Sequence, residues 1–463
     1  MPSLKPRCLW LTVAVFVTLQ SPAARAWSNH TLCTWQATTP LGHWGERTVT
    51  AETLADFLTK EADRLPKMLA DEEQWAQATV PFYPPRPAAL AFQAPHDGGG
   101  DASALKRAFL QAIRANADMP LALYLQRPPG TAVAPERVVP WPSLSILKSM
   151  SDLDANSLER IDDGATVRVA DVVATASNEP DYGLDIGLWQ DNGTQFGALY
   201  GYGPQPFGNP RLDYGSQAPF HMGFYHESGI VYRAAPYLQH TYPEARIHLY
   251  MTLSRFAFAQ GHAYWGWRFA GWAVHYVQDL AQPYHARVLP GVNVTRMLLT
   301  SVLDMAGVHG PKTAALNRVT NRHTVLENYQ YRHMAAAYRQ GALTDPLLVA
   351  LRDTTDDPSL PRLQPAALRT IVTAQSADAA DALDGQLERS FSAHYVTDPD
   401  TDLAAVPDLD MDSIARQAPV VEQERLSALV AARMRQVGRD TRAVLRAVDP
   451  QETAEAAAGA PRP

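Results

Sequence analysis

One apolar and aromatic block, from Pro243 to about Leu280, limits most strongly what this chain can fold into. Its large side chains recur at helical spacing, and Gly261 predicts a break into two helices before Pro283 ends the second. Further helical patterns cover residues 53–77, 102–119, 314–338, 366–391 and 420–448. No run of alternating residues is long enough to require a sheet as the main scaffold. We therefore predict a mainly α fold.

The first 26 residues have the three parts of a secretory signal peptide. Lys5 and Arg7 give a positive start, residues 8–19 form an apolar run, and small residues lead to Ala26. The apolar run is shorter than the ~20 residues that span a bilayer, so it does not predict a membrane anchor. We expect cleavage after Ala26 and a secreted or periplasmic protein with no transmembrane segment.

Removal of this leader changes the charge and the cysteine content. The full chain has 40 basic and 48 acidic residues; without Lys5, Arg7 and Arg25 the balance is 37 to 48, a net charge of −11. An acidic surface argues against unspecific binding to nucleic acid. Cys33 is the one cysteine left, so the mature chain can form no internal disulfide and its core must supply the stability.

Two histidine–acid pairs with four-residue spacing indicate a metal site. His275 and Asp279 share one face of a predicted helix, and so do His323 and Glu327 on another. His285 follows the first pair closely and can point back to the same cavity. A single such pair is more often a core histidine and an unrelated acid, but two pairs favour a site. Imidazole and carboxylate together match zinc better than calcium or magnesium, which prefer oxygen alone.

The expected mature terminus, Trp27-Ser28-Asn29-His30, supplies further donors. A terminal amine has a pKa of ~7.7–8, and once deprotonated it can bind a metal together with its own carbonyl oxygen. His30 follows closely. Trp27 taken alone is also compatible with an aromatic residue that packs on the surface.

These segments resemble the zinc-dependent bacterial phospholipases C and the related fungal single-strand-specific nucleases. That superfamily is mainly helical, begins its mature chain with tryptophan, and has two signatures, His-x-x-x-Asp followed after five residues by His, and His-x-x-x-Glu. Both signatures are complete here. The segments 179–185 and 219–226 resemble the superfamily's Pro-Asp-Tyr and His-aromatic-aromatic segments.

The resemblance implies about three zinc ions. One is expected on Asp181, His221, His275 and Asp279. A second is expected on Trp27, His30 and a shared Asp279, and the third on His285, His323 and Glu327. His226 is the alternative to His221, and Asp185 the alternative to Asp181. The resemblance also implies that Asp181 orients or deprotonates the attacking water.

The spacings between these residues are longer than compact members of the superfamily need. We therefore expect a zinc-dependent phosphodiesterase domain over 27–340, with an insertion at about 34–175, and a helical C-terminal extension of unknown role over 341–463. The inserted segments are expected to lie at the mouth of the site.

The function that the resemblance implies is a phospholipase C that hydrolyses the glycerol-side phosphodiester bond of phospholipids at membrane surfaces. Glu327, the lack of a disulfide and the acidic balance favour this branch over the alternative, a single-strand-specific zinc nuclease. A lipid- or partner-binding protein with a structural zinc cluster is a further alternative, although structural zinc sites are built largely from cysteine. Six aromatic residues in the loop-like stretch 178–229 are expected to contact lipid, to stack on bases or to belong to the core: Trp189, Phe196, Tyr200, Tyr202, Phe207 and Tyr214.

Overall fold

A computed structural model describes residues 29–93, 101–148, 157–209, 213–292, 294–401 and 408–453, together with Leu403 and Val406. Helices make up most of this part, which confirms the mainly α prediction. Its short strands form two antiparallel ribbons, β1 (Thr48–Thr50) with β4 (Thr166–Arg168) and β2 (Tyr124–Gln126) with β3 (Leu158–Arg160). The expected leader and Trp27 lie outside the described residues.

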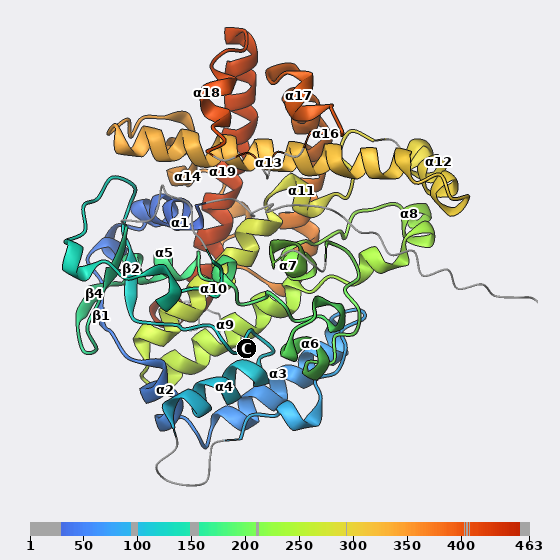
Figure 1. Cartoon of the computed structure of the whole chain (residues 1–463). Coiled ribbons are helices and arrows are strands. Elements are labelled where there is room, and N and C mark those ends of the chain that lie inside the picture. Colours follow the sequence, from blue (N-terminus) through green and yellow to red (C-terminus); the bar gives the residue numbers. More distant parts are fainter. Residues whose placement is uncertain are drawn as a thin grey trace, which may run out of the picture.

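Two helices from the apolar block form the centre of the molecule, α9 (Pro243–Ala259) and α10 (Ala263–Leu280) (Figure 1). Gly261 separates them at a φ of 87°, a left-handed conformation that glycine adopts without strain, so the predicted break is confirmed. Every residue of α10 from Tyr264 to Leu280 is buried. Gly271 lets α5 (Val169–Ala176) approach closely, because a Cβ there would lie 2.5 Å from the Cβ of Ala176.

Segments from both ends of the chain pack on this centre. Helix α1 (His30–Thr38) contacts α5, α10 and α19 (Val420–Val448), and the C-terminal half of α19 is almost entirely buried. The long helix α13 (Gly310–Arg339) lies across the upper part of the molecule in Figure 1. Around it are α11 (Pro283–Ala286), α12 (Val294–Met305), α14 (Pro346–Arg352), α16 (Thr373–Ser390), α17 (Ala393–Val396) and α18 (Met411–Ala415). The short α15 (Pro365–Ala367) packs instead in the same core cluster as α9 and α10.

Residues 39–168 cover further parts of the central helices: the two ribbons lie at the left of Figure 1, and the helices between residues 54 and 112 lie at its bottom. The helix expected over 53–77 is two helices, α2 (Leu54–Lys60) and α3 (Leu65–Thr79), and the helix expected over 102–119 ends early, as α4 (Ala102–Ala112). Pro66 lies in the first turn of α3, where it needs no backbone donor, so it starts a helix instead of kinking one.

The loop-like stretch 178–229 contains α6 (Gln195–Leu199) and α7 (Asp213–His221) and leads into α8 (Gly229–Ala234). Five of its six aromatic residues are buried, so the core interpretation holds for them: Trp189, Phe196, Tyr200, Tyr202 and Phe207. The ring of Trp189, for example, packs 5.2 Å from the rings of both Tyr202 and Phe220. Tyr214 is half-buried. In the part of the chain that the structure describes, no helix combines the length and the apolar character needed to cross a bilayer.

Candidate metal centre

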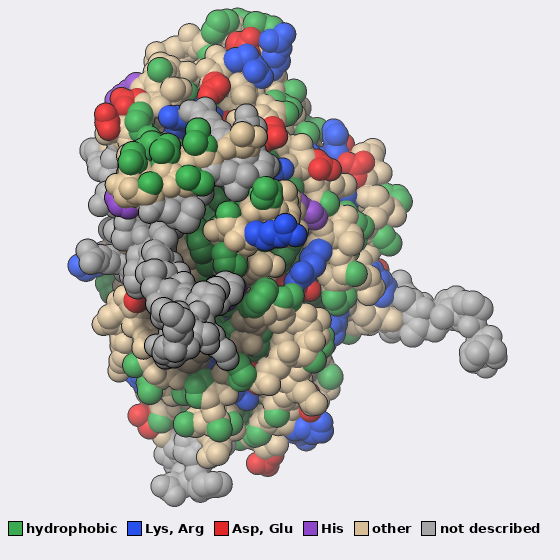
Figure 2. All heavy atoms as spheres, turned by 90° about the vertical axis from the view of Figure 1, so that its right-hand side faces the viewer, with side chains coloured by type: hydrophobic (Ala, Val, Ile, Leu, Met, Phe, Trp, Pro, Cys, Tyr) green, Lys and Arg blue, Asp and Glu red, His purple; other side chains and the backbone are tan. Residues whose placement is uncertain are grey.

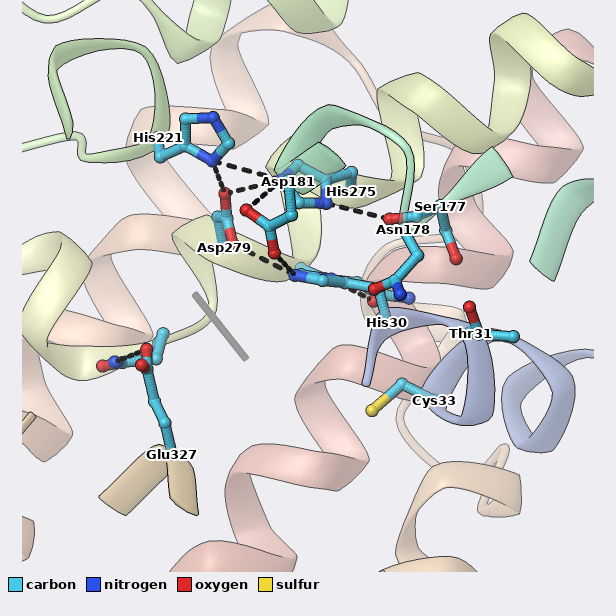
Figure 3. A network of polar contacts seen from close by, with 12 residues as sticks. His30, Thr31, Cys33, Ser177, Asn178, Asp181, His221, His275, Asp279 and Glu327 are labelled. Carbon is cyan, nitrogen blue, oxygen red and sulfur yellow. Dashed lines mark hydrogen bonds and ion pairs between the residues drawn. The ribbon is translucent and has the colours of Figure 1, made fainter. Parts of the chain in front are cut away.

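Buried histidine and acidic side chains converge in three groups that can hold metal ions. In each group, one ligand atom of every member lies within 4.8 Å of the others. The groups are His30, Asp181 and His275; His221, His275 and Asp279; and His285, His323 and Glu327. The structure therefore brings together all the predicted side-chain ligands, over a sequence separation of almost 300 residues (Figure 3).

The central helices determine how these side chains meet. His275 and Asp279 lie one turn apart on the last two turns of α10, and the short α11 carries His285 back towards them. His30 is the first residue of α1, whose preceding residue Asn29 caps the helix by accepting a hydrogen bond from Leu32. Asp181 lies on a short 3-10 turn, His221 ends α7, and His323 and Glu327 are one turn apart on α13.

The first two groups are neighbours that meet at the carboxylate of Asp279. Its Oδ2 is 2.7 Å from Nδ1 of His221 and 3.3 Å from Nε2 of His275, and its Oδ1 is 3.5 Å from Nε2 of His30. Asp181 lies on the other side of His30 and His275, 3.8 Å from Nε2 of each ring. We call these two groups the paired groups.

The third group is compact and adjoins the paired groups. Nε2 of His323 is 2.6 Å from Oε1 of Glu327 and 3.2 Å from Nε2 of His285. The other ring nitrogen of His285 is 4.0 Å from Oδ1 of Asp279. Two imidazole nitrogens and a carboxylate oxygen thus face one point.

Hydrogen bonds fix which nitrogen of three of these histidines is free to bind a metal. Nδ1 of His275 is 2.8 Å from the carbonyl oxygen of Ser177, and Nδ1 of His285 is 3.0 Å from that of His221. Nδ1 of His30 is 2.8 Å from the amide oxygen of Gln278. Because an amide oxygen only accepts, each Nδ1 carries the proton and each Nε2 presents its lone pair to the groups.

Burial keeps these imidazoles neutral and opposes the charge on the acids. It lowers the pKa of His30 to about 4 and the pKa values of His275 and His285 well below the usual value. It also raises the pKa of Asp279 to about 8 and that of Glu327 above its usual value. A bound cation would offset the cost of burying these carboxylates.

His221 behaves differently from the other histidines. Burial opposes its protonation, but hydrogen bonds to Asp185 and Asp279 outweigh burial and raise its pKa to about 10. A positive charge is therefore stabilised at this position. Within the described residues, the buried atoms Nε2 of His30 and Oδ1 of Asp279 have no hydrogen-bond partner. A metal ion would supply one for both, so the donors fit a metal.

The two alternative ligands lie outside the three groups. Nε2 of His226 is 2.9 Å from the hydroxyl of Thr373. Asp185 pairs with Arg246 at 2.6 Å, accepts a hydrogen bond from the hydroxyl of Tyr276 and lies 3.3 Å from His221, so it supports His221 from behind. The grouping also differs from the expectation in two respects. Asp181 groups with His30 and His275 and not with His221, and the residue common to both paired groups is His275, whereas Asp279 was expected to be shared.

Three glutamines support the donors, and the sequence did not predict them. Gln278 binds His30, and its amide nitrogen donates to Thr34 and Thr441. Gln282 donates to Glu327 at 2.9 Å, and Gln217 donates to Asp181 at 3.0 Å. Glutamine has no charge and no distinctive spacing here, so no pattern in the sequence singles it out.

The centre opens on a cavity whose walls are mainly apolar. His221, His285 and His323 form part of its lining. The other lining residues include Phe207, Ala218, Met222, Phe224, Leu238, Val288, Leu316 and Val319. A polar ligand group bound at the histidines would thus continue into apolar surroundings.

Comparisons of the sequence with protein-family models and with curated proteins, and of the structure with solved structures, gave no match.

Proposed function

We propose that this protein is a zinc-dependent phosphodiester hydrolase that acts on phospholipids as a phospholipase C. The observation that carries the proposal is the convergence of three adjoining donor groups at the end of one cavity. Adjoining metal sites are typical of enzymes that hydrolyse phosphate esters, because neighbouring ions can hold the attacking and the leaving oxygen.

Zinc is the metal that the donor types favour. The groups contain only imidazole nitrogen and carboxylate oxygen, whereas calcium and magnesium sites are built from oxygen alone. Cys33 is buried beside Gln330 and belongs to none of the three groups. A purely structural zinc cluster would favour cysteine ligands.

The chain's own residues have defined roles in this proposal. Zinc held by the donor groups would supply a water of pKa ~7 and would stabilise charge on the phosphoryl oxygens. Gln217 holds Oδ1 of Asp181, which orients that carboxylate to accept a proton from a water molecule. His221, His285 and His323 reach the cavity, so a phosphate group there lies against the donors. The apolar walls accommodate the glycerol and acyl part.

The cavity favours lipid over nucleic acid as the substrate. Proteins that bind single-stranded nucleic acid track its backbone with a positively charged groove. Among the described residues, no lysine or arginine lines this cavity. The expected products from a phospholipid are diacylglycerol and a phosphorylated headgroup.

The proposal is tested by metal content and by hydrolysis of two substrates. We expect purified protein to contain zinc, to release phosphorylated headgroup from phosphatidylcholine vesicles, and to lose this activity with a chelator and regain it with zinc. His285→Asn removes a donor and is expected to abolish the activity, whereas His226→Asn, outside the groups, is the matched control and keeps it. Faster cleavage of single-stranded DNA would favour the nuclease alternative, and protein without bound metal would reject both.

A further inference from the structure

Exposed aliphatic side chains gather on one face of the molecule, over α8 and α12. Ile230 on α8, Leu299 and Val302 on α12, and Val308 after it are each between 46 and 59% exposed. Leu299 and Val302 are three residues apart and lie on one side of α12. This side of the molecule, the right-hand side of Figure 1, faces the reader in Figure 2, where hydrophobic side chains are visible on it. We call these four residues the α8–α12 face.

The same two helices also have apolar side chains on their inner side. Val231 on α8 packs with Phe207, Phe224 and Leu238 in a small apolar cluster, against which Met297 on α12 also packs. A surface helix normally buries one apolar side and presents polar residues on the other. Because Val231 and Met297 already face the interior, the outer aliphatic residues are left for contact with something else.

Beneath this face, a second cavity adjoins the cavity at the metal centre. This second cavity lies between α8, α12 and the start of α13. It shares four lining residues with the cavity at the metal centre: Tyr237, Leu238, Val288 and Leu316. Thr300, Lys312 and Arg318 also line the second cavity, but most of its lining is apolar. A chain of methylene groups that enters beside α8 and α12 would therefore meet mainly apolar surfaces on its way to the histidines.

The acidic group on α12 is neutralised within the protein. Asp304 is buried, and its carboxylate accepts hydrogen bonds of 2.7 Å from both His309 and Lys312. Asp304 therefore adds no free negative charge to the α8–α12 face, and a lipid headgroup layer would not have to accommodate one.

We propose that the α8–α12 face docks on the surface of a lipid bilayer and that the two adjoining cavities admit an acyl chain, which enters beside α8 and α12, towards the metal centre. Docking by itself does not depend on hydrolysis; the role of the acyl chain rests on the proposed function. Transfer of exposed aliphatic side chains from water into the bilayer supplies the binding energy, at ~25 cal/mol per Å² of apolar surface.

The test measures binding of the mature protein, which begins at Trp27, to phosphatidylcholine vesicles by sedimentation, together with hydrolysis of a short-chain phosphatidylcholine below its micelle concentration. The variant Leu299→Asp/Val302→Asp is expected to lower vesicle binding about 10- to 100-fold and to keep hydrolysis of the soluble substrate. The control is Val420→Asp/Val421→Asp, which changes two exposed valines in the first turn of α19 and is expected to bind vesicles like the wild type.

Insertion is followed by a polarity-sensitive fluorophore on Leu299→Cys, compared with one on Val420→Cys. Cys33 does not compete for the label, because burial raises the pKa of its thiol to about 12. We expect vesicles to change the emission only at position 299. The proposal would be overturned if the Leu299/Val302 variant bound vesicles as well as the wild type, or if the α19 control lost as much vesicle binding as that variant. So would a wild-type dimer that this variant dissociates, which would make the face a protein interface. Vesicle binding without any phosphodiesterase activity would leave docking intact and reject the proposed function alone.

Discussion

The paired groups and the third group use the same donor types, but different parts of the molecule hold them in place. The paired groups centre on α10, and Gln278 on that helix joins His30 to Thr441 on the buried half of α19. The third group depends on α13, a long helix whose central part packs against the C-terminal helices. Its acid, Glu327, is held by Gln282. We infer that the paired groups are as rigid as the core, whereas the third group depends on the position of α13.

The largest effect should come from removing the acid at the meeting point of the paired groups. Asp279→Asn keeps the shape of the side chain but removes the negative charge that lies next to four histidines. We therefore expect loss of metal from both paired groups. Activity should fall on the order of 1000-fold or more, because several kcal/mol of charge stabilisation are lost. The matched variant, Glu327→Gln, should lose one metal ion and keep the other sites. Elemental analysis of the two purified proteins measures the difference.

Equal metal loss in the two variants would contradict the distinction between the groups. Circular dichroism serves as the control for folding, since both substitutions are isosteric and neither should change the helix content.

A smaller effect is expected from the two supporting glutamines, which are four residues apart near the end of α10. Gln278→Leu removes the acceptor that fixes the tautomer of His30, whereas Gln282→Leu removes the donor to Glu327. Loss of such supporting hydrogen bonds typically costs 10- to 100-fold in metal affinity. We expect Gln278→Leu to weaken the paired groups and Gln282→Leu to weaken only the third, as measured by competition with a chromophoric chelator. The distinction between the groups fails if both variants weaken the binding of the same metal ion.

These glutamines also show where prediction from the sequence ends. The donors could be predicted because metal chemistry requires few residue types, and spacings such as that from His275 to Asp279 place them on one helix face. A supporting residue only has to reach its partner. Gln278 reaches His30, and its amide group is held by Thr34 and Thr441, which are more than 400 residues apart in the sequence. Such long-range pairing leaves no local pattern.

The fold shows the same limit. Helical periodicity and Gly261 were sufficient to predict α9, α10 and the break between them. The aromatic residues of 178–229 have no periodicity, so the sequence could not tell surface from core, and tertiary packing around Trp189 decides in favour of the core. The pairing of Asp412 with His333 was not foreseen either, because the two residues are 79 positions apart.

The smallest predicted effect concerns pH and the attachment of α13. His333, six residues after Glu327, lies 2.8 Å from carboxylate oxygens of both Asp345, which caps α14, and Asp412 on α18. Burial opposes its protonation, but these hydrogen bonds outweigh burial and raise its pKa to about 9. Because the folded pKa exceeds the unfolded value of ~6.5, the stabilisation is fully present below pH ~6.5 and is lost as the pH rises through about 9.

We therefore expect the free energy of unfolding to fall by about 1–3 kcal/mol between these pH values in the wild type, and by less in His333→Gln. The control His226→Gln should follow the wild type. Hydrogen exchange should locate the loss, because above pH 9 the backbone amides of α13 and α18 should exchange faster relative to those of α10 than they do at pH 6.5. A uniform change across all three helices would mean that α13 is as firmly held as the core, and the two kinds of donor group would then share one rigid support.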